Sequence, residues 1–411
     1  MAKNHNSLYS YFTLTNGLQL IHRRTPGAAA AYFGVTVRAG SRDETPGKFG
    51  LAHFVEHTLF KGTERRSAWH ILNRMEAVGG ELNAFTSKEE TTVYTAFPAA
   101  QLNRAAELVA DLLLNSRFPA AELQREREVV ADEIDSYLDQ PGEAVFDDFD
   151  DLLFSGCSLG HNILGTTDDL ARFTSDDCRM WLQRWYTADN MVAFYSGPAG
   201  CDRVTACLER HLAALPSGGH QHSMPELCIN PPFDTEKNVG SHQSHTVIGA
   251  RTGGMYSPDR FAMALLANIL GGPGMNSLLN VSLRERRGLV YTVEASSSLY
   301  TDCGVMSIYY GCDHHDELRC RQLVQKEIEA VAAGESINQR KLDKAKKQYL
   351  GQMLISAENR ENSILGAARA TLFHGRAADR QEMQRHIADI SLQQICRCAE
   401  SICKNSKLTL N

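Results

Sequence analysis

The chain has 411 residues, of which 43% are hydrophobic and 22% are charged, with acidic and basic residues mixed along its length. This length and composition are typical of a folded globular protein of two domains and exclude a disordered or fibrous chain. The net charge of −7 leaves no basic surplus for neutralising phosphates, so nucleic acid is not an expected partner.

Cysteine usage and apolar runs bear on the location of the protein. The eleven cysteines form no C-x-x-C pair and none precedes Cys157, which argues against a zinc ribbon and against a secreted disulfide framework. No stretch approaches the roughly 20 consecutive apolar residues that a membrane span requires. Residues 1–7 show neither a secretory signal nor an organelle presequence. We therefore expect a cytoplasmic protein with reduced thiols and no membrane association.

The first half of the chain predicts two helices and a pair of strands. Residues 50–60 carry apolar side chains at helical spacing. Residues 81–97 alternate and are rich in Thr, Val, Tyr and Phe, which predicts two short strands joined by a turn at 87–89. A second long helix is expected from Pro119 to about Asp139, because Pro is favoured in a first turn and Pro141-Gly142 follows the end.

The second half repeats the coarse plan of the first. Residues 216–235 are rich in Pro and Gly and lack hydrophobic periodicity, which predicts a linker. Strand-like runs at 31–37 and 245–250 hold comparable early places on either side of it. We predict an α+β protein of two similar domains, residues 1–215 and 236–411, each a mostly antiparallel β-sheet covered by α-helices.

The sequence His53-Phe54-Val55-Glu56-His57 lies within the first predicted helix. Because the two histidines are four residues apart, their imidazoles rise from one face of a helix and can meet a single metal ion. Glu56 lies about 100° around the helix from His57, close enough to take a proton from a metal-bound water. Zinc lowers the pKa of such a water, which can then attack an amide. The alternative is a chance spacing of two surface histidines and a glutamate.

A catalytic zinc site needs a third protein ligand and one open position. The second long helix offers six acidic candidates, Glu122, Glu126, Glu128, Asp132, Glu133 and Asp135. Glu126 and Glu133 project from nearly the same face but lie about 10 Å apart along the axis, so only one can bind a given ion. The other can hydrogen-bond to a ligand. Spacing alone does not choose between them, and a plain solvated acidic face is the alternative.

The sequence around these residues resembles the pitrilysin/insulinase family of zinc peptidases. The resemblance is closest to its short two-domain members, of the type of the mitochondrial processing peptidase catalytic subunit and bacterial relatives. It is carried by the segments GSRDE (40–44), GLAHFVEHTLFKGT (50–63), LNAFTS (82–87) and REREVVADE (125–133). This ordered set is far more specific than the five-residue motif.

The resemblance implies roles for the residues of both helices. It makes His53, His57 and Glu133 the zinc ligands and Glu56 the general base. It makes Glu126 a carboxylate that hydrogen-bonds to a ligand. The choice between the two glutamates therefore comes from the resemblance.

The resemblance also implies a substrate-binding strand. Asn83 and Ala84 match the family's edge strand, to which an extended peptide adds as a further β-strand over the metal. Main-chain pairing of this kind explains modest sequence specificity. Without the resemblance, Asn83 would be interpreted as a turn residue at a strand end.

In the second half, residues 270–277 and 283–291 resemble the family's glycine-rich turn and its Arg/Tyr element. Arg284 and Tyr291 then fall at positions from which a guanidinium and a phenol can donate hydrogen bonds to a substrate carbonyl and stabilise the oxyanion. Without the resemblance, these would be a solvated helix charge and a half-buried strand residue.

The position of the Arg/Tyr element implies an oligomer. In the long, four-domain members of this family the element belongs to the fourth domain and faces the zinc site of the first. The resemblance therefore implies that a second chain supplies Arg284 and Tyr291 across a closed chamber. We expect a homodimer rather than a pair with an inactive partner, because one chain carries both the zinc set and the Arg/Tyr pair.

We therefore predict a Zn²⁺-dependent endopeptidase that hydrolyses peptides or extended polypeptides. One alternative is a site-specific presequence-processing protease. The other is a non-catalytic structural or partner subunit of the same fold, against which the intact motif argues.

Overall fold

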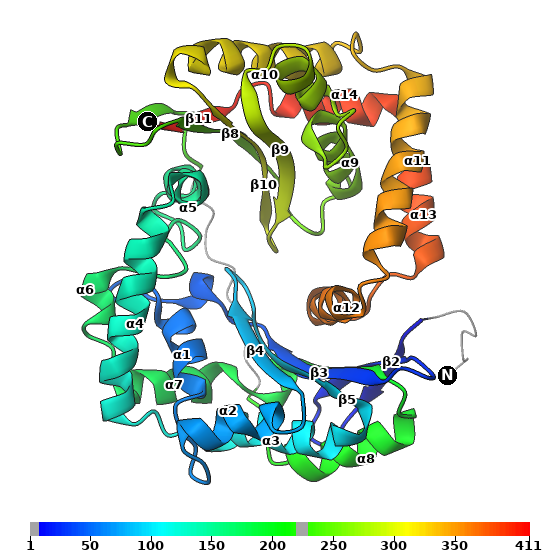
Figure 1. Cartoon of the computed structure of the whole chain (residues 1–411). Coiled ribbons are helices and arrows are strands. Elements are labelled where there is room, and N and C mark those ends of the chain that lie inside the picture. Colours follow the sequence, from blue (N-terminus) through cyan, green and yellow to red (C-terminus); the bar gives the residue numbers. More distant parts are fainter. Residues whose placement is uncertain (1–7, 219–228) are drawn as a thin grey trace. The chain divides into compact units, whose positions relative to one another are not determined.

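The computed structural model describes residues 8–218 and 229–411. The chain divides into two compact units (Figure 1). The first consists of Met1–Asp135, His161–Ser223 and Ser356–Asp379, and the second of Ser136–Gly160, Met224–Ile355 and Arg380–Asn411. Among the described residues, no helix combines the length and apolarity that crossing a membrane requires.

The first unit contains one sheet and most of the helices of the first half. Its strands are β1 (Ser10–Thr13), β2 (Gln19–Arg24), β3 (Ala30–Val37), β4 (Glu81–Thr86), β5 (Thr91–Pro98) and β6 (Met191–Gly197). Its helices are α1 (Leu51–Leu59), α2 (Ala68–Glu76), α3 (Leu102–Asn115), α4 (Ala120–Leu138, whose last turn passes into the second unit), α6 (Thr167–Leu170), α7 (Ser175–Trp185), α8 (Cys201–Leu212) and α12 (Arg360–His374). Short 3-10 segments are η1 (Ser41–Asp43), η2 (Ala99–Gln101) and η3 (Ala188–Asn190).

The second unit contains the other sheet. Its strands are β7 (Asp234–Lys237), β8 (Ser244–Gly253), β9 (Val290–Leu299), β10 (Cys303–Cys312) and β11 (Ser406–Leu410). Its helices are α5 (Pro141–Leu153), α9 (Arg260–Gly271), α10 (Glu317–Ala332), α11 (Gln339–Ser356), α13 (Arg380–Ala388) and α14 (Leu392–Ser401), with a π-helical segment η4 (Asn280–Glu285) and a 3-10 segment η5 (His314–Asp316).

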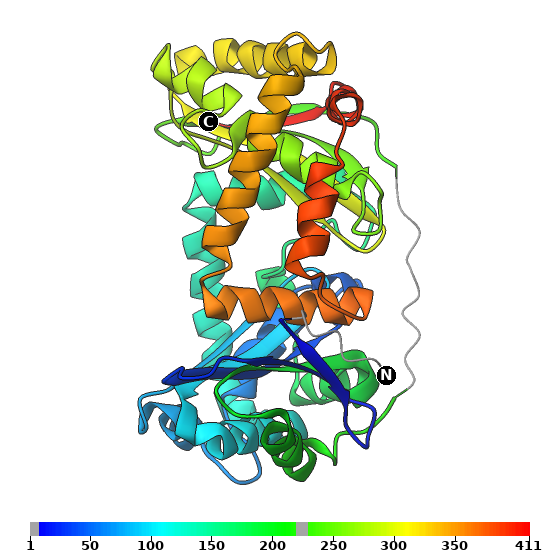
Figure 2. The same ribbon diagram turned by 90° about the vertical axis from the view of Figure 1, so that its right-hand side faces the viewer.

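The sheet of the first unit has the order β1-β2-β6-β3-β5-β4, and its neighbours are antiparallel except for β2 and β6. Side chains of β6 alternate between two cores, because successive strand residues point to opposite faces. Ala193 and Tyr195 join the core with α1, α2, α3, α7 and α8, whereas Val192 and Phe194 pack against α12. Figure 2 shows α12, in orange, lying across the strands of this sheet.

The sheet of the second unit has the order β7-β11-β8-β10-β9, and its neighbours are antiparallel except for β7 and β11. Ile248 and Ile308 face the core built with α9, α10 and α14. Val247 and Val305 face the opposite side and pack with Phe149 of α5. This sheet, too, is therefore covered on both faces.

The two sheets share one topology. Numbered 1 to 5 in chain order, β2–β6 and β7–β11 both follow the spatial order 1-5-2-4-3, with the parallel pair between the first and the last strand. The predicted α+β fold of two similar domains, each a mostly antiparallel sheet covered by helices, is thus confirmed.

The units differ from the predicted ranges 1–215 and 236–411 at two places. Residues 136–160, with α5, join the second sheet, and residues 356–379, with α12, join the first. Each of these helices buries its apolar side on the sheet that the other half of the chain forms, so no single linear boundary separates the units. Of the predicted linker 216–235, residues 219–228 lie outside the described residues.

The elements predicted around the motif are confirmed. The helix expected over 50–60 is α1, and the helix expected from Pro119 is α4. The strand pair expected over 81–97 is β4 and β5. The ten cysteines among the described residues are all free thiols.

Candidate metal centre

The start of α1 is fixed by a glycine and a buried carboxylate. Gly50 precedes the helix with a φ of 92°, a left-handed conformation that favours glycine. A Cβ at this position would lie 2.4 Å from the carbonyl oxygen of Leu164. The backbone N–H groups of Gly50 and Ala52 donate to the carboxylate of Glu44 over 2.8 and 2.7 Å. These contacts satisfy N–H groups that the first helical turn leaves free, and they fix the direction of α1.

Every residue of α1 except His57 is buried. Phe54 and Val55 are fully buried in the core under the sheet, so the helix cannot roll without exposing apolar surface. His53 and Glu56 are only 7% and 8% exposed. Buried polar groups of this kind need partners. Glu56 has one in β4 and Nε2 of His53 faces Glu133 of α4, whereas Nδ1 of His53 has no hydrogen-bond partner among the described residues.

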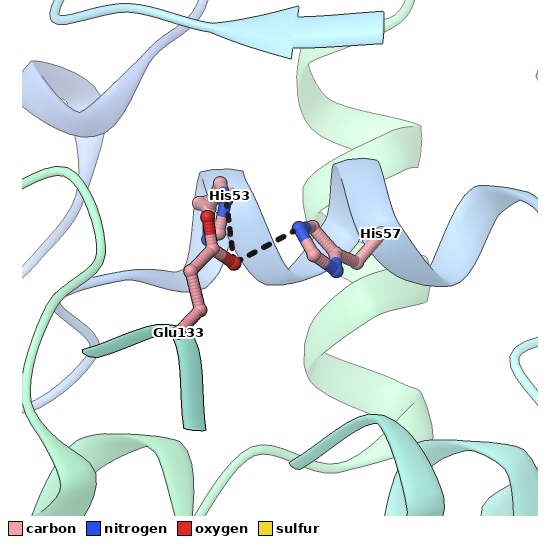
Figure 3. A group of neighbouring side chains, drawn as sticks. All are labelled: His53, His57 and Glu133. Atoms are coloured by element: carbon pink, nitrogen blue, oxygen red, sulfur yellow. Dashed lines mark ion pairs between the residues drawn. The ribbon is translucent and has the colours of Figure 1, made fainter. Parts of the chain in front are cut away.

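His53 and His57 face one carboxylate of α4. Their ring centroids lie 4.4 Å apart. Figure 3 shows Glu133 pointing at both imidazoles, with Oε2 at 3.8 Å from Nε2 of His53 and 3.4 Å from Nε2 of His57. One ligand atom from each residue lies within 4.8 Å of the others. Within residues 8–218 and 229–411, this is the one group of three or more His, Cys, Asp or Glu side chains arranged to hold a metal ion.

The donor set fits a zinc ion. Two imidazole nitrogens and a carboxylate oxygen are ligands that catalytic zinc accepts. Ligands about 2.1 Å from a tetrahedral ion lie about 3.4 Å from one another, close to the observed separations of 3.4 and 3.8 Å. Burial, and then the neighbouring His57, lower the pKa of His53 to about 3, so its imidazole is neutral and keeps a lone pair for a cation.

Glu126 contacts the His57 imidazole on the side opposite Glu133. Its Oε1 lies 2.9 Å from Nδ1 of His57, which leaves Nε2 of that ring facing Glu133. Its Oε2 lies 2.6 Å from Nζ of Lys61. Burial raises the pKa of Glu126, but the hydrogen bonds to His57 and Lys61 outweigh it and hold the pKa below its usual value. The structure thus brings Glu133 to both imidazoles and Glu126 to the far side of one of them.

Glu56 lies beside this group on the same helix. Thr86, the last residue of β4, donates a hydrogen bond from Oγ1 to Oε2 of Glu56 over 2.8 Å. Burial raises the pKa of Glu56, and this effect outweighs the opposing ones of Thr86 and His57. A carboxylate with a raised pKa accepts a proton more readily, which suits a general base.

The strand that reaches Glu56 is the last of its sheet. β4 pairs with β5, with Asn83 opposite Tyr94 and Ala84 opposite Val93. In the described part of the chain no further strand pairs with β4. Asn83 and Ala84 are half-buried and Phe85 is 39% exposed. An edge strand carries unpaired backbone groups that can take up another chain, and here that edge ends at the buried carboxylate.

Arg284 and Tyr291 belong to the second unit. Arg284 lies in the π-helical segment η4 and is exposed, and Tyr291 lies near the start of β9 with 78% of its surface exposed. The acidic and imidazole groups described above all belong to the first unit.

Three supporting residues were not predicted from the sequence. Glu44 lies in a segment that carries the family resemblance, but an acidic residue six positions before a glycine gives no sign of capping a helix. Lys61 follows His57 by four residues, and Thr86 ends the predicted strand. Lysine and threonine are so common on surfaces that neither position stands out.

Comparison with known proteins finds two family models that match the chain. The family model described as "Insulinase (Peptidase family M16)" matches residues 19–167. The model described as "Peptidase M16 inactive domain" matches residues 172–349. The matched ranges fall on the two halves of the chain.

Similar full-length proteins carry the name zinc protease. An uncharacterized zinc protease of Mycobacterium leprae is 32% identical over 394 residues, which covers 95% of this chain and 88% of the relative. The uncharacterized zinc protease YmxG of Bacillus subtilis is 30% identical over 387 residues, which covers 93% of each.

Solved structures share the fold over the whole chain. A protease from Helicobacter pylori gives a TM-score of 0.91 at 21% identity, covering 99% of this chain and 100% of that one. A peptidase M16 inactive domain from Pseudomonas fluorescens gives a TM-score of 0.90 at 17% identity, covering 98% and 97%. At these identities the likeness concerns the fold.

Proposed function

Since this chain belongs to the insulinase family of peptidases, peptidase family M16, we propose that it is a zinc-dependent endopeptidase acting on peptides or extended polypeptides. The relatives named as zinc proteases support the metal and the reaction class. The observation that carries the proposal is the convergence of His53, His57 and Glu133 beside the buried carboxylate of Glu56.

The metal would be held by the two imidazoles of α1 and the carboxylate of Glu133. Zinc bound there supplies a water of lowered pKa and polarises the scissile carbonyl. The chain itself orients the ligands: Glu126 accepts a hydrogen bond from His57, and burial keeps His53 neutral.

Glu56 would act as the general base and later as the acid. Thr86 occupies Oε2 of Glu56, so Oε1 is the oxygen left to accept a proton from water. The raised pKa of this carboxylate lets it keep that proton until the leaving amine takes it. Glu56 would thus carry one proton from the oxygen of the attacking water to the nitrogen of the leaving amine.

The peptide substrate would bind along β4. An extended segment can pair with the backbone of Asn83 and Ala84 as an added strand, and this places its backbone next to Thr86 and Glu56. Because main-chain pairing reads no side chains, we expect broad sequence preference for unfolded polypeptides.

Completion of the site would come from a second copy of the chain. Arg284 and Tyr291 are exposed donors on the second unit. In a homodimer, the partner's second unit would present the same two donors to the substrate carbonyl, where they stabilise the oxyanion. The dimer would enclose a chamber that excludes folded substrates by size.

Cleavage of a peptide library, with mass-spectrometric mapping of the products, tests the reaction class. We expect many cleavage sites, loss of cleavage on chelation, recovery on adding zinc, and no cleavage by Glu56→Gln. Cleavage at a single defined site would instead indicate a processing protease. Absence of all cleavage in protein that contains stoichiometric zinc would indicate a non-catalytic subunit.

Mixing two variants of strongly reduced activity tests the dimer. A Glu56→Gln chain lacks the base, and a Tyr291→Phe chain lacks the oxyanion donor. Subunit exchange creates one site with both groups intact, so activity should recover in part. No recovery in mixed dimers verified by mass spectrometry would contradict the homodimeric site.

A further inference from the structure

Lys61, two residues beyond the end of α1, forms an ion pair with Oε2 of Glu126. Nζ of Lys61 lies 2.6 Å from Oε2, while Oε1 of the same carboxylate lies 2.9 Å from Nδ1 of His57. The Glu126 side chain is only 5% exposed, so bulk water is a poor substitute for this partner. Among the residues that the structure describes, Lys61 is the partner of Oε2.

The backbone of Lys61 is held on both sides. Its N–H donates to the carbonyl of Thr58 over 3.1 Å. The next residue, Gly62, accepts a hydrogen bond from the N–H of Arg117 over 3.1 Å and forms a β-bridge with Ser67. The Lys61 side chain is 29% exposed. It therefore starts from a fixed point and does not behave as a freely solvated surface lysine.

Glu133, the carboxylate of α4 that faces both imidazoles, has no lysine or arginine partner among the described residues. Glu133 has a side chain that is 44% exposed, and its ion-pair partners in the described chain are His53 and His57. Glu126 is buried and bound at both oxygens, whereas Glu133 is more exposed and lies near the two imidazoles. The two glutamates thus have different surroundings on one helix, and the contact with Lys61 is part of that difference.

We propose that Lys61 is a positioning residue of the metal site, which aims Oε1 of Glu126 at His57 by holding Oε2. This inference rests on the proposed function, because it assigns Lys61 a part in zinc binding. Hydrogen-bond partners of a metal-bound histidine set its orientation and basicity. Without Lys61, the carboxylate loses one of its two fixed contacts and can rotate away from Nδ1 of His57.

Zinc dissociation constants of purified full-length variants test the proposal, measured by competition with a chromophoric chelator. We expect Glu126→Gln to weaken zinc binding by about 10–100-fold and Lys61→Met by about 10-fold. Lys61→Arg should stay within about 3-fold of the wild type, because a guanidinium can make the same contact. Arg125→Met removes a neighbouring cation, paired with Glu122 at 2.9 Å, and should leave zinc affinity unchanged.

The double variant separates positioning from general stability. If Lys61 acts through Glu126, then Lys61→Met in the Glu126→Gln background should change zinc affinity by less than about 2-fold. Melting temperatures of the zinc-free variants confirm that each is folded at the temperature of the titration.

Three results would overturn the inference. They are an unchanged zinc affinity in folded Lys61→Met, a loss as large in Arg125→Met, or fully additive effects in the double variant. In each case wild-type zinc binding would remain, and with it the proposed function. A wild-type chain that binds no zinc would remove the proposed function itself.

Discussion

The two units place different side chains on the same framework. In the first, helix α1 follows β3, packs near β4 and carries His53, Glu56 and His57. In the second, helix α9 follows β8 and packs near β9, which holds the place of β4 in the strand order. The buried residues of α9 are Ala, Met, Leu and Gly. The two units thus share the arrangement of sheet and helix, whereas the cluster of His and Glu side chains occurs in the first, on α1 and α4.

The largest expected effect is loss of the base in the first unit. Glu56→Gln should lower kcat by about 10²–10⁴-fold, because the amide cannot accept the proton from water. Zinc content should stay at the wild-type level, since Glu56 is not one of the three proposed zinc ligands. Steady-state kinetics and metal analysis measure the two quantities.

Glu128→Gln on α4 is the matched control, because Glu128 is exposed and takes part in none of the contacts described for the site. It should leave kcat within about 2-fold, as surface changes usually have small effects. An equal loss of kcat in Glu56→Gln and Glu128→Gln would contradict a specific catalytic role for Glu56.

Metal removal should affect the two units unequally. A ligand that binds only the folded state at about 1000 times its Kd stabilises it by about 4 kcal/mol. Because the proposed zinc ligands lie on α1 and α4, chelation should speed amide hydrogen exchange in those helices and leave α9 and α14 almost unchanged. Exchange measured by mass spectrometry in zinc and in chelator tests this. Uniform acceleration in both units would contradict a metal site confined to the first.

Tyr291→Phe tests the contribution of the second unit to catalysis. If the phenol donates to the oxyanion, its removal should lower kcat by about 10²-fold, the low end for one oxyanion donor. Zinc affinity should not change, because Tyr291 lies in the second unit. Tyr256→Phe, another exposed tyrosine of that unit at 53% exposure, is the control and should stay active. A loss of zinc from Tyr291→Phe would contradict a role limited to the substrate.

Local sequence patterns predicted the helices and strands of the site, whereas tertiary packing determines which side chains contact one another. The helical spacing of residues 50–60 and the alternation of 81–97 predicted α1, β4 and β5 because period and turn chemistry are properties of neighbouring residues. The choice between Glu126 and Glu133 stayed open from spacing alone. The face that α4 turns to α1 is set by contacts far apart in sequence. In the structure Glu126 lies against Nδ1 of His57, and Glu133 lies against Nε2 of the same ring.

The placement of α5 in the second unit and of α12 in the first shows that sequence patterns also fail to predict tertiary contacts at the scale of domains. A Pro- and Gly-rich stretch marks a boundary in the linear chain, yet each of these helices covers the sheet built mostly from the other half. The apolar side of each helix predicts that the helix is buried, but it does not identify the sheet against which it packs. Domain number and fold class were therefore predictable, and the course of the chain between the units was not.

The smallest expected effect concerns the hydrogen bond that ties β4 to the base. Thr86→Val removes the donor 2.8 Å from Oε2 of Glu56 and keeps the shape of the side chain. A hydrogen bond to a charged group is worth about 1.5–3 kcal/mol, and water can replace part of it at this half-buried position. We therefore expect kcat to fall about 10-fold with little change in KM and none in zinc affinity. Thr252→Val in β8 of the second unit should leave kcat unchanged. If KM rises instead while kcat holds, Thr86 serves the substrate strand and Glu56 needs no help from β4.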